Sequence, residues 1–403
     1  MINSKTSEEK PLSGIRVFDA TQGVAGPHAT MLLALNGADV IKVEPIDGDW
    51  CRVLGRSVGQ ESANFYSFNR GKRSLAYDAK SPAGREIAQR LASSCDIFVE
   101  SFRPGVADRI GLGYESLARC NPNIVYASVS GFGQVGPNSQ RPTVDGLIQA
   151  YSGMMVMNKN EDGKPYRIAM IVVDVLTGLY ASQAITTALI RKLRFNKGAR
   201  IDISMAQAAA AFQAAKIMEF VESDGKPAPL YVPAGMFQTA DGYIVVSGMR
   251  AHHFAALCKV IGRPDIGTDR RWPTQQKRVA HGELINAELR KAFVLEKTEH
   301  WLNGLHQAGV FAEKVQSYGD WLQEEHALAT KAYSWIDHPT IGHLPVAHVP
   351  GILPTGDSAT ADSAPLLGQQ SCEILTELGF SSQWIDKQIN NGNVRENTDR
   401  ENP

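Results

Sequence analysis

The stretch that decides the fold is residues 15–43, IRVFDATQGVAGPHATMLLALNGADVIKV. Its start, residues 15–18, is a short apolar run typical of a buried strand. Gly26-Pro27 then opens a helical pattern that ends near Asn36, because proline is tolerated in the first turn of a helix. Residues 38–43 predict a second strand. A strand, a helix and a strand in this order form a β-α-β unit, which indicates a parallel sheet.

The same alternation continues beyond this unit. Further strands are predicted at residues 73–77, 96–99, 124–129 and 200–203. Ser81-Pro82 opens a helix between the first two of them, and long Ala-rich helical patterns lie on either side of the last. We therefore predict an α/β fold built on a doubly wound, Rossmann-like parallel sheet. No G-x-G-x-x-G follows the first strand, which argues against a dinucleotide enzyme.

A second, smaller domain is expected in the middle of the chain. The 403 residues exceed what one hydrophobic core usually serves, and Asp224 to Pro229 breaks the helical pattern as a linker would. Asp241-Gly242 then marks a hairpin turn, and helical patterns follow it. We predict a large Rossmann-like domain over residues 1–224, a small α+β domain over 225–330, and a return to the large domain over 331–403, with two closing helices and a frayed tail.

The composition excludes several classes of partner. The chain is 43% hydrophobic and 21% charged, with a formal net charge of -1, so no global field favours nucleic acid or an anionic membrane. The five scattered cysteines form no C-x-x-C pair, which argues against a disulfide framework and a zinc site. The N-terminus lacks the apolar core of a signal peptide, and the apolar stretches are too short or too charged to span a bilayer. We expect a soluble cytoplasmic protein.

Asp174 follows the apolar run at residues 168–173 and precedes a helical pattern that extends to residue 193. An aspartate at a helix start commonly accepts hydrogen bonds from the N–H groups of the first turn and suits the positive end of the helix dipole. A carboxylate that borders apolar chain is also partly desolvated, which makes it a candidate nucleophile or acid/base. Both interpretations remain open from the residues alone.

Basic residues at the predicted strand ends are the evidence for an anion site. They are Arg70, Lys72, Arg73, Lys80, Arg103 and Arg109. Two or more of them could hold phosphates if the sheet gathers them at one edge. A solvated basic surface is the alternative.

Other catalytic classes have less support. The histidines lack the spacing of metal ligands, so we expect no metal site. Ser128 and Ser130 form no G-x-S-x-G elbow, which argues against a serine hydrolase. Asp145 could be a second acid, although a turn or cap role fits it better.

Several separate segments of the chain recur in one known family, in the same order. They are PLSGIRV (11–17), AGP (25–27), GADVIKVE (37–44), NRGKRS (69–74), GFGQVGP (131–137) and ADGY (240–243). With them the chain resembles the class III coenzyme A transferases of the CaiB/BaiF type, the family of formyl-CoA transferase and carnitine CoA-transferase, which also includes the α-methylacyl-CoA racemases. The resemblance covers about Pro11 to Ile389.

The resemblance implies a role for Asp174, which falls on the catalytic aspartate of the family's Asp-x-x-x-Gly segment. This carboxylate would attack the thioester carbonyl of the donor to give a mixed anhydride, and the released CoA thiolate would then form an enzyme-CoA thioester. An acceptor carboxylate would reverse the sequence. Such a site must exclude water and supply donors to the developing oxyanion.

The resemblance also implies ligand contacts and an assembly. Contacts with CoA fall on Val24, Ala25, Tyr77, Lys80, Ser101, Phe102, Arg103, Arg109 and Met205. Coenzyme A thioesters and carboxylic acids are then substrates, and no tightly bound cofactor is expected. The family's chains form interlocked homodimers, which would explain the return of the C-terminal segment to the first domain.

Two departures from the family pattern bear on the substrate. Formyl-CoA transferase has a glutamine where this chain has Val24, and a glycine-rich loop that is not found near residues 247–249, which argues against formate or oxalate. The racemases place a histidine just before the acid equivalent to Asp145, where this chain has Val144, so two-base proton exchange loses one partner. We expect transfer of CoA from an acyl-CoA to a free carboxylic acid, with a dicarboxylate as one option. A racemase and a catalytically silent CoA-binding protein are the alternatives.

Overall fold

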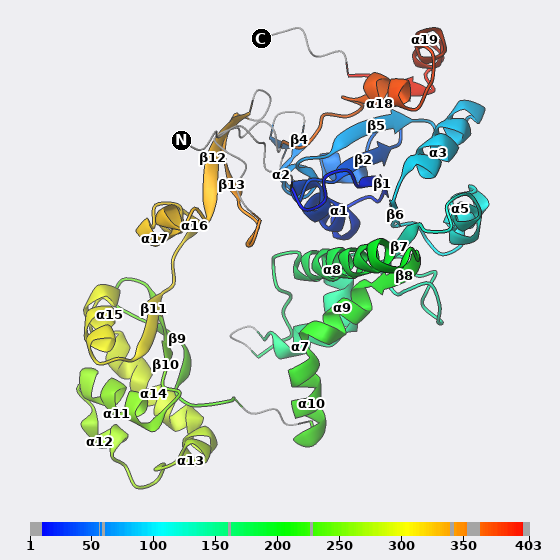
Figure 1. The fold of residues 1–403 in the computed structure, drawn as a ribbon. Helices are drawn as coiled ribbons and strands as arrows, with labels where there is room; N and C mark the ends of the chain where they lie inside the picture. The colour runs from blue at the N-terminus through cyan, green and yellow to red at the C-terminus, as the bar shows by residue number, and fades with distance from the viewer. Residues whose placement is uncertain are drawn as a thin grey trace. The chain divides into compact units, whose positions relative to one another are not determined.

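The computed structural model describes residues 10–55, 57–58, 61–159, 163–225, 229–338, 342–352 and 363–397. The chain divides into two compact units (Figure 1): unit 1 comprises Met1–Ala214 and Tyr333–Pro403, and unit 2 comprises Ala215–Ala332. The large domain was predicted to end at residue 224, whereas the first part of unit 1 ends at Ala214. The helix in between, α10 (Ala214–Glu222), has no buried residue that would tie it to the core of unit 1. Residues 226–228 of the predicted linker lie outside the described residues.

Unit 1 is built on a seven-stranded sheet in the order β14-β5-β2-β1-β6-β7-β8. Its strands are β1 (Arg16–Ala20), β2 (Asp39–Glu44), β5 (Arg73–Tyr77), β6 (Ile97–Glu100), β7 (Val125–Ser130), β8 (Ala199–Ser204) and β14 (Val394–Arg395). Neighbouring strands pair in parallel, except that β14 pairs antiparallel with β5. The predicted α/β class with a large, mostly parallel sheet is confirmed. The strand order changes direction between β1 and β6, where open α/β sheets usually bind ligands.

Helices cover both faces of this sheet (Figure 1). On one face, α1 (Ala25–Leu35) and α8 (Val172–Phe195) pack in the cluster that contains Val17. On the other, α3 (Pro82–Ser94), α5 (Tyr114–Cys120) and α18 (Ser371–Glu377) pack in the cluster around Phe18. Successive residues of β1 thus serve opposite faces, as the pleat of a strand requires. Shorter elements of unit 1 are η1 (Trp50–Val53), β3 (Ser57–Val58), β4 (Glu61–Ser62), α2 (Ala63–Asn69), α4 (Val106–Arg109), α6 (Asp145–Tyr151), α7 (Met154–Met157) and α9 (Met205–Phe212).

The helices α1 and α8 pack closely because Gly178 has no side chain. A Cβ at Gly178 would lie 2.6 Å from Nδ1 of His28 in α1. Without that Cβ, the His28 ring lies against α8, and its Nδ1 is 3.1 Å from the carbonyl oxygen of Val175. This contact fixes the first turns of α8, which carry Asp174.

The chain returns to unit 1 after Ala332. There β12 (Tyr333–His338) and β13 (Gly342–Ala347) form an antiparallel hairpin, and α18 and α19 (Ser382–Asn390) follow. Arg73 of β5 ties α18 to the sheet through ion pairs with Glu373 and Glu377, at 3.1 and 2.8 Å. Val394 and Arg395, which we expected in a frayed tail, form β14 instead, because Val394 is buried against the core.

Unit 2 holds a three-stranded antiparallel sheet in the order β11-β10-β9. Its strands are β9 (Ala234–Gln238), β10 (Tyr243–Ser247) and β11 (Phe311–Lys314), and its remaining helices are α11 (Ala251–Val260), α12 (Pro264–Gly267), α13 (Gln275–Ala280), α14 (Gly282–Phe293), α15 (Thr298–Gln307), α16 (Tyr318–Trp321) and α17 (Glu325–Ala329). The predicted hairpin at Asp241-Gly242 joins β9 and β10. The helices α13 and α14 are separate because the backbone leaves the helical conformation at His281.

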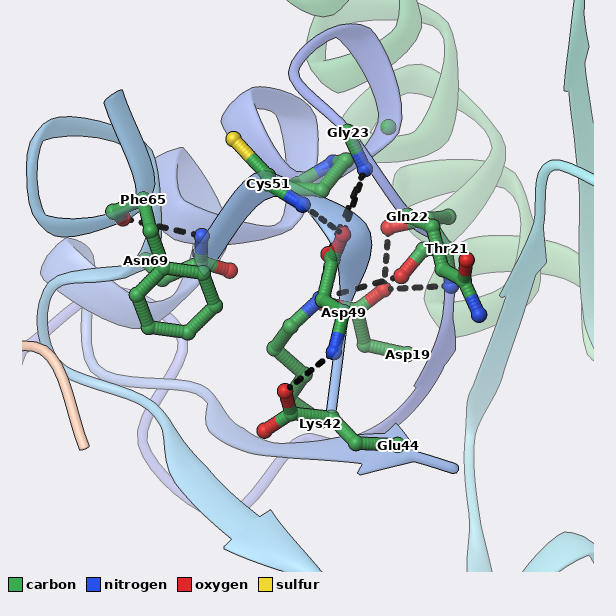
Figure 2. A network of polar contacts seen from close by, with 12 residues as sticks. Asp19, Thr21, Gln22, Gly23, Lys42, Glu44, Asp49, Cys51, Phe65 and Asn69 are labelled. Carbon is green, nitrogen blue, oxygen red and sulfur yellow. Dashed lines mark hydrogen bonds and ion pairs between the residues drawn. The ribbon is translucent and has the colours of Figure 1, made fainter. Parts of the chain in front are cut away.

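A network of buried charges lies beneath the turn between β1 and α1 (Figure 2). Asp19 of β1 pairs with Lys72 Nζ at 2.9 Å, and Lys42 of β2 pairs with Asp49 at 2.8 Å. All four side chains are 0% exposed. Asp49 also accepts hydrogen bonds from the N–H group of Gly23. The network therefore links two strands of the sheet to the backbone of this turn.

Replacing Lys72 by methionine is expected to lower the free energy of unfolding by about 3–5 kcal/mol, because the Asp19 carboxylate would stay buried without its cation. Urea unfolding of the full chain measures the change. Glu86→Ala is the control: it breaks the pair with Arg90, whose side chains are 41% (Arg90) and 45% (Glu86) exposed, and should change the free energy by less than about 1 kcal/mol. Equal effects of the two substitutions would contradict a structural role of the buried pair.

Candidate active site

A cavity of about 680 Å³ opens at the carboxyl ends of β1, β6 and β7 in unit 1. The residues that follow these strands line it, and so does the first turn of α8. Of the predicted site residues, the cavity gathers Asp174, Val24, Ala25, Ser101, Phe102, Arg103 and Met205. Residues far apart in the sequence thus meet at one edge of the sheet, where its strand order changes direction.

Three of the predicted CoA contacts do not line this cavity. The Tyr77 side chain is 2% exposed and belongs to the core on the α3 face, and its contact with CoA stays a prediction. Lys80 lies in the exposed turn after β5, and Arg109 lies at the exposed end of α4. Contacts of Lys80 and Arg109 with CoA stay predictions.

Asp174 lies in the first turn of α8 and is half-buried. Burial, and then the negative charge of Asp145, raise the pKa of Asp174 from 3.8 to about 7. Among the residues that the structure describes, none donates a hydrogen bond to the Asp174 carboxylate. A carboxylate that is desolvated and accepts no hydrogen bond is more basic than an ordinary aspartate, which suits a nucleophile.

Asp145, and not Asp174, caps the start of α8. One oxygen of Asp145 accepts hydrogen bonds from the N–H groups of Val173, at 2.7 Å, and Asp174, at 3.2 Å. Its other oxygen accepts from the side chain of Gln149, at 2.6 Å. The capping interpretation of Asp174 is therefore wrong, because a carboxylate from α6 already occupies the N–H groups of that turn. The cap role considered for Asp145 is confirmed, although the helix it caps is not its own.

The turn between β1 and α1 also lines the cavity. The N–H group of Gln22 donates to Ser101 Oγ at 2.9 Å, which joins this turn to the loop after β6. No side chain caps α1, and its first residues, Ala25 and Gly26, line the cavity. The N–H groups at such an uncapped helix start suit an anionic oxygen.

Glu100, at the end of β6, holds the loop that carries Ser101 to Arg103. Its carboxylate accepts a hydrogen bond of 2.6 Å from the N–H group of Phe102. Burial raises the pKa of Glu100 to about 7, although that hydrogen bond and one with Ser128 lower it. Sequence reasoning missed this residue, although an acid at the end of a buried strand is a usable signal.

The basic residues flagged in the sequence have different partners. Lys72 and Arg73 are ion-paired with Asp19 and with Asp39, so they serve the fold and not an anion site. Arg103 lines the cavity, and two arginines that sequence reasoning missed, Arg141 and Arg167, line it as well. Arg141 lies well beyond the end of β7 and Arg167 follows no predicted strand, so a position at a strand end marks neither of them.

Metal and membrane signals are weak in the described parts of the chain. No group of three or more residues there could hold a metal ion. One helix, α8, is long and apolar enough to cross a bilayer by length and composition alone. Residues such as Val173, Ala181 and Ile185 bury one face of α8 in the core, which is the pattern of a helix that covers a sheet.

Comparison with known proteins decides the family. The sequence profile of CoA-transferase family III matches residues 12–371. The chain belongs to this family. Succinyl-CoA:glutarate CoA-transferase of Mus musculus is 35% identical over 396 residues, which cover 96% of this chain and 91% of the relative. Acetyl-CoA:oxalate CoA-transferase of Acetobacter aceti is 38% identical over 308 residues, which cover 74% of this chain and 79% of the relative.

A solved structure gives the same result. The crystal structure of a CaiB/BaiF family protein from Brucella suis has a TM-score of 0.81 at 30% identity and covers 92% of this chain and 100% of the other. The predicted family and the predicted class of enzyme, a CoA-transferase, are confirmed.

Asp174→Asn is expected to raise the free energy of unfolding at high pH. Because burial raises the pKa of Asp174 from 3.8 to about 7, the folded state holds the proton more tightly than the unfolded chain between these values. Stability is therefore lost as the pH rises through this window. Asparagine removes the charge, and the gain should reach up to about 4 kcal/mol above pH 7 and shrink toward pH 4. Urea unfolding of both proteins at pH 5 and pH 8.5 measures it, and a gain that does not grow with pH would contradict the raised pKa.

Proposed function

We propose that this family III CoA-transferase moves CoA from an acyl-CoA donor to a free dicarboxylic acid, with Asp174 as the nucleophile. The observation that carries the proposal is a half-buried carboxylate without a hydrogen-bond partner in the described residues, in the cavity at the strand ends. The acceptors in the names of the two curated relatives, glutarate and oxalate, are both dicarboxylates. We argued against oxalate because Val24 replaces a glutamine of formyl-CoA transferase. That argument is weaker because a relative at 38% identity is named as an acetyl-CoA:oxalate CoA-transferase.

The reaction has two halves, and both take place at the Asp174 carboxylate: CoA passes from the donor to the enzyme, and then from the enzyme to the acceptor. The Asp174 carboxylate attacks the thioester carbonyl of the donor, the C–S bond breaks, and CoA leaves as a thiolate from a mixed anhydride. The thiolate then attacks the aspartyl carbonyl, which releases the donor acid and leaves an enzyme-CoA thioester. The acceptor carboxylate repeats both steps in reverse and regenerates the Asp174 carboxylate. With a pKa of about 7, Asp174 is roughly half ionised at neutral pH and more basic than an ordinary aspartate.

The cavity walls supply what this chemistry needs. Val24 and Ala25 place uncapped N–H groups of α1 beside the cavity, where they can hold the oxyanion that develops at the thioester carbonyl. Ser101, Phe102 and Arg103 follow β6 on one wall, and Met205 follows β8. We assign CoA to this side, with Arg103 as a phosphate partner and Lys80 and Arg109 as further cations.

Proton exchange of the racemase type is disfavoured by the partners of Asp145. Its carboxylate accepts hydrogen bonds from the backbone of Val173 and Asp174 and from Gln149. A base with both oxygens engaged is poorly placed to take a proton from carbon. Val144, in the position of the racemase histidine, has no titratable group.

Asp174→Ala is expected to lower the rate of CoA transfer at least roughly 1,000-fold, because the chemistry loses its nucleophile. The assay follows transfer from succinyl-CoA or acetyl-CoA to a panel of dicarboxylic acids. Asp386→Ala, in α19 and outside the cavity, is the control and should keep full activity. Full activity of the Asp174 variant would contradict the proposal, and α-carbon deuterium exchange without an acceptor would support a racemase instead.

We also propose that the protein is a homodimer, in which the two chains interlock. Helix α10 has no buried residue, although it carries Met218, which is 72% exposed, and Val221, which is 75% exposed. Helix α8 exposes Ile190 and Leu193 as well. Apolar surface on this scale is typical of a protein interface, and an isolated nine-residue helix without packing is marginal in water. The insertion of unit 2 between the two parts of unit 1 is compatible with interlocked chains.

The double substitution Met218→Glu/Val221→Glu is expected to dissociate the dimer, because two charges would be buried in the interface. Light scattering should then give a mass near 43.9 kDa per particle instead of twice that value. The pair Gln89→Glu/Ser93→Glu adds the same charge to an exposed face of α3 and should leave the dimer intact. A native protein that is monomeric at micromolar concentration would contradict the proposal.

A further inference from the structure

Arg167 and Asp174 lie at the two ends of one segment that α6 holds in place. The backbone of Ile168 is bound in both directions by Gln149 of α6: its N–H group donates to Gln149 Oε1 at 2.8 Å, and its carbonyl accepts from Gln149 Nε2 at 3.2 Å. The other end of the segment is bound through the N–H groups of Val173 and Asp174, which donate to Asp145. The segment is therefore fixed next to both residues of interest.

The two residues that hold the segment form one rigid support. Asp145 and Gln149 are four residues apart on one face of α6, both are buried, and their side chains are hydrogen-bonded to each other at 2.6 Å. A change in the position of α6 would move Arg167 and Asp174 together. The support thus fixes the backbone beside Arg167 relative to the backbone of the proposed nucleophile.

The Arg167 guanidinium lies over the first turn of α6. Its Nη1 atom would be 3.7 Å from a Cβ at Gly146, the residue next to Asp145. Arg167 lines the cavity together with Asp174. In the described parts of the chain, no carboxylate pairs with Arg167 and no acceptor binds its guanidinium, so its charge is available to an anion in the cavity.

The other two cations that line the cavity are Arg103 and Arg141. Arg103 follows β6, and Gln140, next to Arg141, donates a hydrogen bond of 3.2 Å to the carbonyl of Pro104 in the same loop. The Arg141 guanidinium packs over the Phe132 ring at 5.7 Å. Arg103 is thus on the side that we assign to CoA. Arg141 contacts that side through Gln140, and through Phe132 it also contacts the apolar cluster that includes Ile168 and Val173. Of the three arginines, Arg167 is the one that directly precedes the segment ending at Asp174 in the chain.

We propose that Arg167 binds the second carboxylate of a dicarboxylate substrate while the first faces Asp174. A guanidinium offers two parallel N–H donors, which match the two oxygens of a carboxylate. The inference rests on the proposed function, in which the acceptor takes the place of the departed donor acid. One arginine therefore serves both halves of the reaction, because the acyl group of the donor and the acceptor occupy the same position in turn. Arg167 then selects dicarboxylates over monocarboxylates of equal length.

The test compares two thioesters that differ only at the far end of the acyl chain. Succinyl-CoA carries a terminal carboxylate, and butyryl-CoA carries a methyl group in its place. Their dissociation constants are measured by calorimetry with the Asp174→Asn protein, so that no turnover occurs, and with Asp174→Asn/Arg167→Gln. We expect the second substitution to weaken succinyl-CoA roughly 10- to 100-fold and butyryl-CoA less than 2-fold. Lys159→Gln, which removes a positive charge from a residue that does not line the cavity, should change neither.

Each other result contradicts the inference in its own way. If the Arg167→Gln substitution lowered the affinity for both thioesters equally, Arg167 would bind the CoA moiety. If it lowered the affinity for neither, Arg167 would not belong to the binding site. A parent protein that binds butyryl-CoA as tightly as succinyl-CoA would exclude selection for dicarboxylates. The experiment measures binding without chemistry, so its outcome does not depend on which residue is the nucleophile. If Asp174 proved not to be the nucleophile but the protein still preferred succinyl-CoA, the proposed function would be overturned and the role of Arg167 would stand.

Discussion

The hydrogen bonds that Asp145 accepts from the N–H groups of Val173 and Asp174 are the interaction on which the site depends. They satisfy the start of α8 with a carboxylate from another helix, so the Asp174 side chain is not needed as a cap. The same negative charge adds to burial in raising the pKa of Asp174. One residue therefore both frees the proposed nucleophile and makes it more basic.

Buried polar side chains fix the other walls of the cavity in a comparable way. Asp49 holds the turn between β1 and α1 through Gly23, and Glu100 holds the loop after β6 through Phe102. Each of these carboxylates gives up hydration for a small number of hydrogen bonds, which contributes little to net stability. What the bonds contribute is position. Backbone groups at two strand ends, like those at the start of α8, are held where a thioester would have to fit.

Most of the large domain could be predicted from local patterns. The apolar runs and Gly26-Pro27 located β1, α1 and β2 to within two residues, and β5 was predicted at its observed bounds of 73–77. Local patterns failed where partners are distant in sequence. Lys72 was considered for an anion site because nothing near it in the chain reveals its pairing with Asp19. β14 was missed because two residues become a strand only against β5.

The candidate site was less accessible to sequence reasoning. Physical chemistry made Asp174 a candidate, and the family resemblance selected it. The measurement that tests its role most directly is mass spectrometry of the protein after incubation with an acyl-CoA in the absence of an acceptor. The account predicts that the peptide containing Asp174 gains the mass of CoA less one water, and that hydroxylamine removes the adduct. An enzyme that turns over without this adduct, or that carries it on another residue, would contradict the account.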